Sequence, residues 1–317
     1  MRVGPMRKAL SGFRGTRRNR RDLNGPTSDA EGLGQSWAHH SPEWATRSTG
    51  DHMTAIDTDF ETIRIETPGN YVGHLVLDRP EDMNTVSATM LEELDEAVDV
   101  LEDHEEVRAI YITGEGEKAF SAGADVSSNG AMDNREGVEH SRYGQQVFGK
   151  FRESDQPVIA GIDGYALGGG LELSMCADLR VASESSEMGL PEHNLGLLPG
   201  WGGTQRLQRL IGESAAKYVV FTAERIPAER MHELGFVHEI YDDDEFEERA
   251  LEFAENVAGG PPIAQKYTKR AMREGWDNME AGLELEASAF GHLLDTEDLS
   301  EGITAFVTDQ EPEFEGK

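Results

Sequence analysis

The apolar positions of the chain alternate with polar ones over short stretches and elsewhere recur every three to four residues, which predicts a mixed α/β protein. Two strands are predicted over 62–66 and 71–77, joined by a Pro-Gly-Asn turn. Ser87 is the predicted cap of a helix, which has the apolar face Met90, Leu91, Leu94, Ala97, Val98 and Leu101. A third strand over 108–113 follows. Strand, strand, helix and strand form the start of a repeating ββα pattern.

The middle of the chain is harder to interpret. Residues 127–140 are rich in Gly, Asn and Asp and have no apolar period, which predicts a loop or lid segment. It leads into a helix expected around 143–151, and the apolar run 157–160 predicts the next strand.

Helices dominate the last third. A short strand is predicted over 236–241, followed by an acidic turn. The next helical stripe consists of Phe246, Ala250, Phe253, Ala254 and Val257. A Gly-Gly-Pro-Pro break follows it, and two further helices are predicted, over 263–273 and 279–294.

The charge is large and unevenly distributed. The 317 residues carry a formal net charge of −32, with 29 Lys and Arg against 61 Asp and Glu. Residues 1–52 hold nine of the basic and five of the acidic residues, so the rest of the chain has a net charge of −36. A body this acidic repels nucleic acid and anionic lipid. It is also typical of proteins from a high-salt cytoplasm, where screening removes the self-repulsion, so we expect a halophilic protein.

Residues 1–52 differ from the rest. Arginines cluster among Gly, Ser and Asn, aliphatic residues are scarce, and no apolar segment typical of a secretion signal follows. This composition predicts a disordered basic extension. A nucleic-acid-binding arm and a targeting peptide are alternatives, and a third is that translation starts at Met53, so that the extension is absent from the native protein.

Other protein classes lack their signals in this sequence. Cys176 is the single cysteine, so no intrachain disulfide can form. No run of eighteen apolar residues predicts a membrane helix, and we expect a soluble, cytoplasmic protein without a membrane partner. The ten histidines show no metal-ligand spacing, and neither a P-loop nor a dinucleotide fingerprint occurs. No metal or cofactor is therefore predicted.

The stretch 161–178, GIDGYALGGGLELSMCAD, carries the first candidate chemistry. Gly168, Gly169 and Gly170 follow a strand and precede a helical pattern, so the backbone there can approach a ligand closely. A helix start offers unpaired N–H groups to an oxygen that carries negative charge. Glu172 lies two residues beyond the last glycine. Taken alone, such a triplet is as well explained by a tight turn.

Two further stretches change that interpretation: KAFSAGADV over 118–126 and MGLPEHNLGLLPGWGGTQRL over 188–207. With the glycine triplet, and in this order, they resemble the crotonase (enoyl-CoA hydratase/isomerase) superfamily from about Asp57 to the C-terminus. The resemblance implies a ββα superhelix, or spiral, as the core, over 53–245, and a C-terminal helical region over 246–317 that mediates trimer formation. A homotrimer or a dimer of trimers is the expected assembly.

The resemblance also assigns roles residue by residue. Ala124 and Gly169 match the two N–H donors of the family's oxyanion hole. Glu172 matches the first catalytic carboxylate, which orients or activates water, and Glu192 matches the second, which protonates the α-carbon of the substrate. A glutamate alone is usually a solvated residue, so the assignment depends on the whole constellation.

Contacts to coenzyme A, which is part of the substrate, follow from the same resemblance. Ala122, Ala124, Asp125 and Gly168 are the candidates near the glycine motifs. Phe306 matches a phenylalanine that reaches a neighbouring subunit's nucleotide, but Thr308-Asp309-Gln310 stands where relatives carry basic residues. Lys118 is a possible substitute for them.

Two of the residues in these motifs also have a structural interpretation. Asp125 could be a third catalytic carboxylate, but a loop-stabilising role fits a residue after a turn. Trp201 is expected to pack beside its glycine turn.

The function expected from the resemblance is the reversible hydration of a 2-trans-enoyl-CoA to a 3-hydroxyacyl-CoA. Retention of both glutamates favours a hydratase over a Δ3,Δ2-enoyl-CoA isomerase, which needs one shuttling carboxylate. A non-catalytic acyl-CoA-binding subunit is the alternative from another class.

Overall fold

The computed structural model describes residues 54–56, 58–125 and 132–317. All of them belong to one compact unit. The predicted basic extension, residues 1–52, and residues 127–131 of the predicted loop lie outside these ranges.

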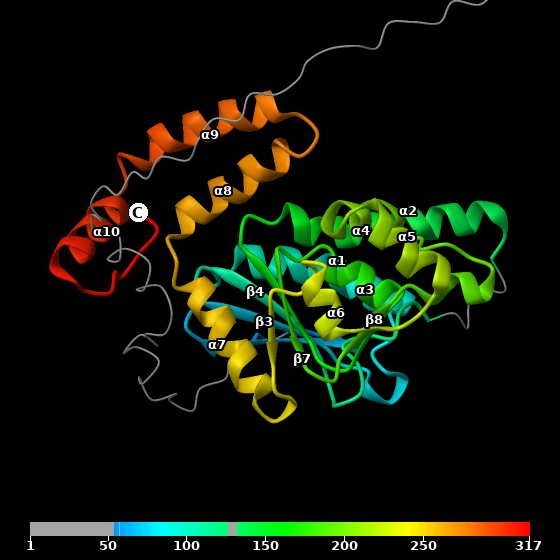
Figure 1. Ribbon diagram of the computed structural model, residues 1–317. Coiled ribbons are helices and arrows are strands. Elements are labelled where there is room, and N and C mark those ends of the chain that lie inside the picture. Colours follow the sequence, from blue (N-terminus) through cyan, green and yellow to red (C-terminus); the bar gives the residue numbers. More distant parts are fainter. Residues whose placement is uncertain (1–53, 57, 126–131) are drawn as a thin grey trace, which may run out of the picture. The chain divides into compact units, whose positions relative to one another are not determined.

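A seven-stranded sheet is the centre of the fold, with the strand order β1-β2-β3-β4-β5-β7-β10 (Figure 1). Strands β1 to β3 pair antiparallel, and from β3 onward every neighbouring pair is parallel. The strands are β1 (Thr54–Ala55), β2 (Ile63–Gly69), β3 (Val72–Leu77), β4 (Ala109–Gly114), β5 (Val158–Ile162), β7 (Leu179–Ser183) and β10 (Glu239–Tyr241). The strands predicted near residues 62, 71, 108 and 157 are confirmed as β2, β3, β4 and β5.

Helices cover both faces of this sheet. Successive side chains of a strand point to opposite faces. Ile110 and Ile112 on β4 therefore join the core beneath α1 (Ala88–Asp103) and α2 (Asn134–Glu153). Ala109 and Tyr111 instead join a second apolar cluster with α7 (Phe246–Ala258), which crosses the other face. A strand buried on both faces explains the continuous apolar run of β4.

The predicted first helix is confirmed as α1. The Ser87 hydroxyl accepts a hydrogen bond from the Met90 amide at 3.1 Å and so caps the helix. All six residues of the predicted apolar face are buried. A periodic stripe above a sheet is the clearest helix signal that a sequence offers, which is why this element was predictable.

The prediction of a loop over 127–140 is wrong for its second part. Helix α2 begins at Asn134, and the Asp133 and Glu136 side chains form a reciprocal capping box at its start. The first turns of α2 bury no side chain, and Val138 is exposed. This part of the helix therefore has no apolar stripe, and composition suggested a loop.

A second, smaller sheet and several short helices lie in the sequence between the strands of the large sheet and before α7. Strands β6 (Tyr165–Leu167), β8 (Glu187–Gly189) and β9 (Ile226–Pro227) form a second sheet. The short helices here are η2 (Pro80–Asp82), α3 (Gly169–Ser174), η4 (Pro191–Leu195), α4 (Gly203–Ile211), α5 (Glu213–Thr222), α6 (Ala228–Glu233) and η5 (Asp243–Glu245).

Three helices, rather than the two predicted, follow α7. They are α8 (Pro262–Glu274), α9 (Met279–Leu293) and α10 (Glu297–Thr308). The helix missed by the prediction, α10, is capped by Thr296, whose hydroxyl accepts from the Leu299 amide. Its first turn carries Glu297 and Asp298, a typical helix-start signal that the sequence analysis did not use.

Lys269 connects α8 to the end of α2 and to the loops that precede β5 and β7. Its ammonium group lies 2.7 Å from the Asp178 carboxylate and also donates to the carbonyls of Phe151 and Gln156. Only 9% of its side chain is exposed. Nearby Lys266 pairs with Asp155 at 2.6 Å, but its side chain is 40% exposed.

We predict that Lys269→Met destabilises the protein by about 2–3 kcal/mol, because it removes a largely buried charge from its partners. The matched change Lys266→Met should cost less than about 1 kcal/mol, since solvent screens that pair. Denaturant unfolding of both variants measures the difference. Equal losses would show that burial of Lys269 adds nothing to the attachment of α8.

Candidate active site

Backbone hydrogen bonds bring the three sequence motifs together. The Leu167 amide donates to the Ser121 carbonyl at 2.9 Å, and Ser121 forms a parallel bridge with Ala166. The Gly168 amide donates to the Gly189 carbonyl at 2.9 Å. The first motif therefore lies beside the glycine triplet, which in turn adjoins the start of the third motif.

The two predicted N–H donors are neighbours because glycines permit the approach. A Cβ on Gly123, which has φ +104°, would lie 2.8 Å from the Leu167 carbonyl oxygen and 3.3 Å from the Gly169 nitrogen. A Cβ on Gly169 would lie 3.3 Å from the Ala124 nitrogen. A side chain at Gly123 would collide with the Leu167 backbone, and one at Gly169 would collide with the Trp201 ring at 2.5 Å, so only glycine fits at either position.

Among the described residues, nothing occupies the amides of Ala124 and Gly169, so both can donate to a ligand. Gly169 is the first residue of α3, so its N–H has no partner within the helix. Neither the Gly169 nor the Ala124 amide donates a hydrogen bond to another described residue. Two adjacent amide donors of this kind can stabilise negative charge that develops on an oxygen.

Glu172 projects from the first turn of α3 and is buried, with 2% of the residue exposed. Its Oε1 accepts hydrogen bonds from the backbone amides of Trp201, at 2.8 Å, and Gly203, at 2.7 Å. Burial raises the pKa of the Glu172 carboxyl, while these two amides and the charge of Arg206 act in the opposite direction. The glycine turn of the third motif therefore orients this carboxyl group.

Glu192 lies in η4 and has a different environment. Its Oε2 is buried without a hydrogen-bond partner among the described residues, and a Cβ on Gly168 would lie 3.2 Å from its Oε1. Burial, with a smaller contribution from the charge of Glu172, raises the pKa of Glu192 to about 7. The site thus holds one carboxyl with two amide donors and one whose Oε2 lacks any, which is how two glutamates acquire separate acid and base roles.

Trp201 packs as expected. Its residue is 3% exposed, and its ring makes an edge contact with Phe148 at 5.3 Å between centroids. A Cβ on Gly169 would lie 2.5 Å from the indole ring, so the ring sits directly against the glycine triplet. The indole fills the space between α2 and α3 while the backbone amide of the same residue holds Glu172.

The structure brings most of the predicted site residues together, but not all. Ala122 lies in the motif loop, where its amide donates to the Met83 carbonyl at 2.9 Å. Asp125 lies 3.8 Å from the Arg79 guanidinium, and its amide donates to Val86, which agrees with the loop-stabilising interpretation.

Two further candidates for contacts to coenzyme A, Lys118 and Phe306, differ in position. Lys118 is exposed. Phe306 lies on α10 and is 88% exposed. It lines an apolar groove with residues of α8, α9 and the C-terminal tail, to which none of the other predicted site residues contributes.

Two kinds of supporting residue were not predicted from the sequence: the hydrogen-bond partners of Glu172 and a buried asparagine. Gly203 and Trp201 hold Glu172 through backbone amides, which leave no trace in side-chain chemistry. Asn84 is fully buried and donates to the carbonyls of Glu115 and Ala119, which supports the loop before Ser121. For Gly203 the available signal was the Gly-Gly pair in the third motif; Asn84 had none.

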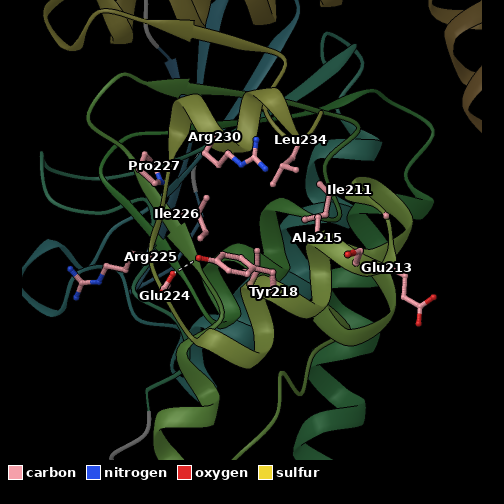
Figure 2. Close-up of a pocket in the computed structure, with 13 residues that line it drawn as sticks. Ile211, Glu213, Ala215, Tyr218, Glu224, Arg225, Ile226, Pro227, Arg230 and Leu234 are labelled. Atoms are coloured by element: carbon pink, nitrogen blue, oxygen red, sulfur yellow. Dashed lines mark hydrogen bonds between the residues drawn. The ribbon is translucent and has the colours of Figure 1, made fainter.

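A separate hollow of about 780 Å3 lies between α5 and α6 (Figure 2). Ala215 and Tyr218 on α5 face Arg230 on α6 and Leu234 at its C-terminal end across the hollow, and the Tyr218 hydroxyl donates to Glu224 at 2.7 Å. None of the predicted catalytic residues lines this hollow.

Metal and membrane signals are absent from the residues that the structure describes. No group of three or more His, Cys, Asp or Glu side chains there could hold a metal ion. None of the helices in this part of the chain is long and apolar enough to cross a membrane.

We predict that Glu192 titrates near neutral pH in the folded protein. Because its pKa is raised to about 7, the carboxyl is protonated below that pH and ionised above it. Infrared difference spectra between the protein and Glu192→Gln should show a protonated-carboxyl band that disappears with a midpoint near 7. A midpoint close to 4 would contradict the environment described above.

Comparison with known proteins identifies relatives over most of the chain. Residues 68–317 match the family model described as Enoyl-CoA hydratase/isomerase. The short-chain-enoyl-CoA hydratase of Clostridium acetobutylicum is 37% identical over 250 residues, which covers 78% of this chain and 95% of the relative. The 2,3-dehydroadipyl-CoA hydratase of Escherichia coli is 35% identical, with 77% and 94% covered.

Solved structures give the same result. The enoyl-CoA hydratase of Bacillus anthracis, at 36% identity, superimposes with a TM-score of 0.77 and covers 81% of this chain and all of that one. The predicted mixed α/β crotonase fold with C-terminal helices is thereby confirmed. With a family model that matches 68–317 and a relative above one-third identity, the chain belongs to the enoyl-CoA hydratase/isomerase (crotonase) family.

Proposed function

We propose that the protein is an enoyl-CoA hydratase that adds water reversibly across the double bond of a 2-trans-enoyl-CoA. The observation that carries the proposal is the pairing of Glu172, oriented by two backbone amides, with Glu192, whose pKa is raised to about 7. The relatives named for hydration of short-chain enoyl-CoA and 2,3-dehydroadipyl-CoA support this reaction class.

The mechanism assigns one step to each group. The thioester oxygen accepts hydrogen bonds from the Ala124 and Gly169 amides, which stabilise the enolate that forms. Glu172, in its ionised form, takes a proton from water as the water oxygen bonds to the β-carbon. Glu192, in its protonated form, gives its proton to the α-carbon. The product is the 3-hydroxyacyl-CoA, and solvent returns a proton from Glu172 to Glu192.

Two other functions use parts of the same site. A Δ3,Δ2-enoyl-CoA isomerase needs one carboxylate to move a proton, and an acyl-CoA-binding subunit needs none. A hydratase is favoured because Glu172 and the Oε2 of Glu192 are both buried beside the same glycine motif. The unpartnered oxygen of Glu192 costs stability, and a catalytic role explains why that cost is kept.

The acyl-CoA thioester is the proposed partner. In this proposal Ala122, Asp125 and Gly168 lie along the thioester and nucleotide, and Phe306 contacts the nucleotide bound to a neighbouring subunit. The high exposure of Phe306 fits a residue that is covered by another molecule. With a net charge of −36 outside residues 1–52, the protein is proposed to work in a salt-rich cytoplasm and not on nucleic acid.

A homotrimer, or a dimer of two trimers, is the proposed assembly, with 246–317 as the oligomerising region. Support comes from apolar side chains that the described residues leave open on α9 and α10: Leu283, Phe290, Leu294, Ile303, Phe306 and Val307. Several of them border the groove between α8, α9 and α10. Monomeric proteins rarely expose an apolar surface of this kind.

We predict that the purified protein hydrates crotonyl-CoA in concentrated KCl and that Glu172→Gln and Glu192→Gln each lower kcat by about 10²- to 10⁴-fold, the usual contribution of a general acid or base. Loss of the ultraviolet absorbance of the conjugated thioester measures the rate. Glu239→Gln, an exposed glutamate on β10, is the matched control and should leave the rate unchanged.

The same variants separate the alternatives. If Glu172→Gln stays largely active on a 3-enoyl-CoA while crotonyl-CoA is not hydrated, the isomerase is correct. If the folded protein binds acyl-CoA and turns over neither substrate, the binding subunit is correct.

We predict that Ile303→Glu shifts the sedimentation mass from a trimer toward the monomer, because a charge would be buried at the proposed interface. Ser300→Glu, an exposed position on the same helix, is the control and should leave the mass at that of the wild type. A trimer that persists in Ile303→Glu would contradict the assignment of this surface.

A further inference from the structure

Arg206 on α4 reaches back to the turn that precedes its own helix. Its Nη1 donates to the Trp201 carbonyl at 2.6 Å, and its Nη2 donates to the Gln145 carbonyl on α2 at 3.5 Å. Gly202, at φ +118°, leaves room for the guanidinium, since a Cβ there would overlap it. The side chain therefore joins α2, α4 and the glycine turn.

The peptide group that Arg206 fixes has a special position. Glu172 accepts from the amides of Trp201 and Gly203, which belong to the peptide groups 200–201 and 202–203. The carbonyl that Arg206 binds belongs to the peptide group between them, 201–202. The orientation of this middle group sets ψ of Trp201 and φ of Gly202, the torsions that lie between the two donors, and Arg206 opposes a change in them.

The guanidinium also acts on Glu172 through its charge. The charged and titratable groups around Glu172 are Cys176 just beyond α3, Glu192 on η4, Arg206 on α4, Arg152 on α2 and Arg180 on β7. Arg206 is the cation of this set that lowers the pKa of Glu172. It also acts on Cys176, together with Arg152 and Arg180, while burial raises the pKa of that thiol to about 11.

We propose that Arg206 is a positioning residue for the hydration reaction, which holds the Trp201–Gly203 turn so that both amides stay on Glu172. The role rests on the proposed function, because it matters for catalysis only if Glu172 is the base. Arg206 itself touches neither the reacting atoms nor the predicted thioester donors.

The test compares Arg206→Gln, Arg206→Lys and the control Arg209→Gln in the crotonyl-CoA assay across pH. Arg209 lies on the same helix but donates only to Gln205 and is 3.9 Å from the exposed Asp277. Arg206→Gln should lower kcat by about tenfold or more, as misplacement of a catalytic group does, with KM changed by less than about twofold.

The pH profile distinguishes positioning from a merely structural role. Removal of the cation raises the pKa of Glu172, so the Glu172 carboxyl becomes protonated, and the enzyme loses activity, at a higher pH than in the wild type. The acidic limb of the kcat profile should therefore move to higher pH. Arg206→Lys keeps the charge, so its acidic limb should stay near that of the wild type and part of kcat should return. Arg209→Gln should match the wild type in both.

Either of two kinetic results would overturn the proposal. The first is that Arg206→Gln and Arg209→Gln have the same kcat and the same pH profile. The second is that Arg206→Gln loses kcat only in proportion to a drop in its unfolding temperature, while the acidic limb of its pH profile stays in place. An infrared titration of the Glu172 carboxyl, as a difference against Glu172→Gln, gives a readout without substrate. An inactive wild type would refute the hydratase, whereas an unmoved Glu172 titration in Arg206→Gln would refute the role of Arg206.

Discussion

The burial of one carboxylate is the constraint on which the site depends. A carboxylate removed from water must recover its hydrogen bonds inside the protein, and Glu172 does so through two backbone amides. Those amides can reach Oε1 only because the turn is built of glycines: a Cβ on Gly203 would lie 3.0 Å from Oε1 and 2.8 Å from Pro199. The glycine turn supplies the two amides, the Trp201 indole packs beside the turn, and the Arg206 guanidinium binds the Trp201 carbonyl within it.

The same requirement explains how two identical residue types differ. Glu172 has donors that favour its ionised form, whereas Glu192 is partly buried and its buried Oε2 has no partner among the described residues. The charge of Glu172 further favours the proton on Glu192. In the proposed mechanism, a difference in environment therefore separates the acid from the base, with no difference in side-chain chemistry.

Much of the fold could be predicted from the sequence, and the exceptions have physical reasons. Helix α1 and strands β2 to β5 were predictable because their apolar periods reflect burial against one core. The start of α2 was not, because its first turns bury nothing, whereas α10 was missed although Thr296, Glu297 and Asp298 form a helix-start signal. The sequence motifs predicted that Ala124, Gly169 and Glu172 belong to one site. They could not predict backbone donors such as the amides of Trp201 and Gly203, because every residue type except proline has such an amide.

The charge of the body poses a problem for a substrate that carries phosphates. A net charge of −36 outside residues 1–52 repels such a molecule over many ångströms at low ionic strength. The screening length falls to about 3 Å at 1 M salt, so concentrated salt removes the repulsion at long range. The oxyanion donors proposed here are neutral amides that act at hydrogen-bond distance, where salt screens an interaction far less than it screens the long-range repulsion. High salt can therefore admit an anionic substrate without weakening the groups that would stabilise its enolate.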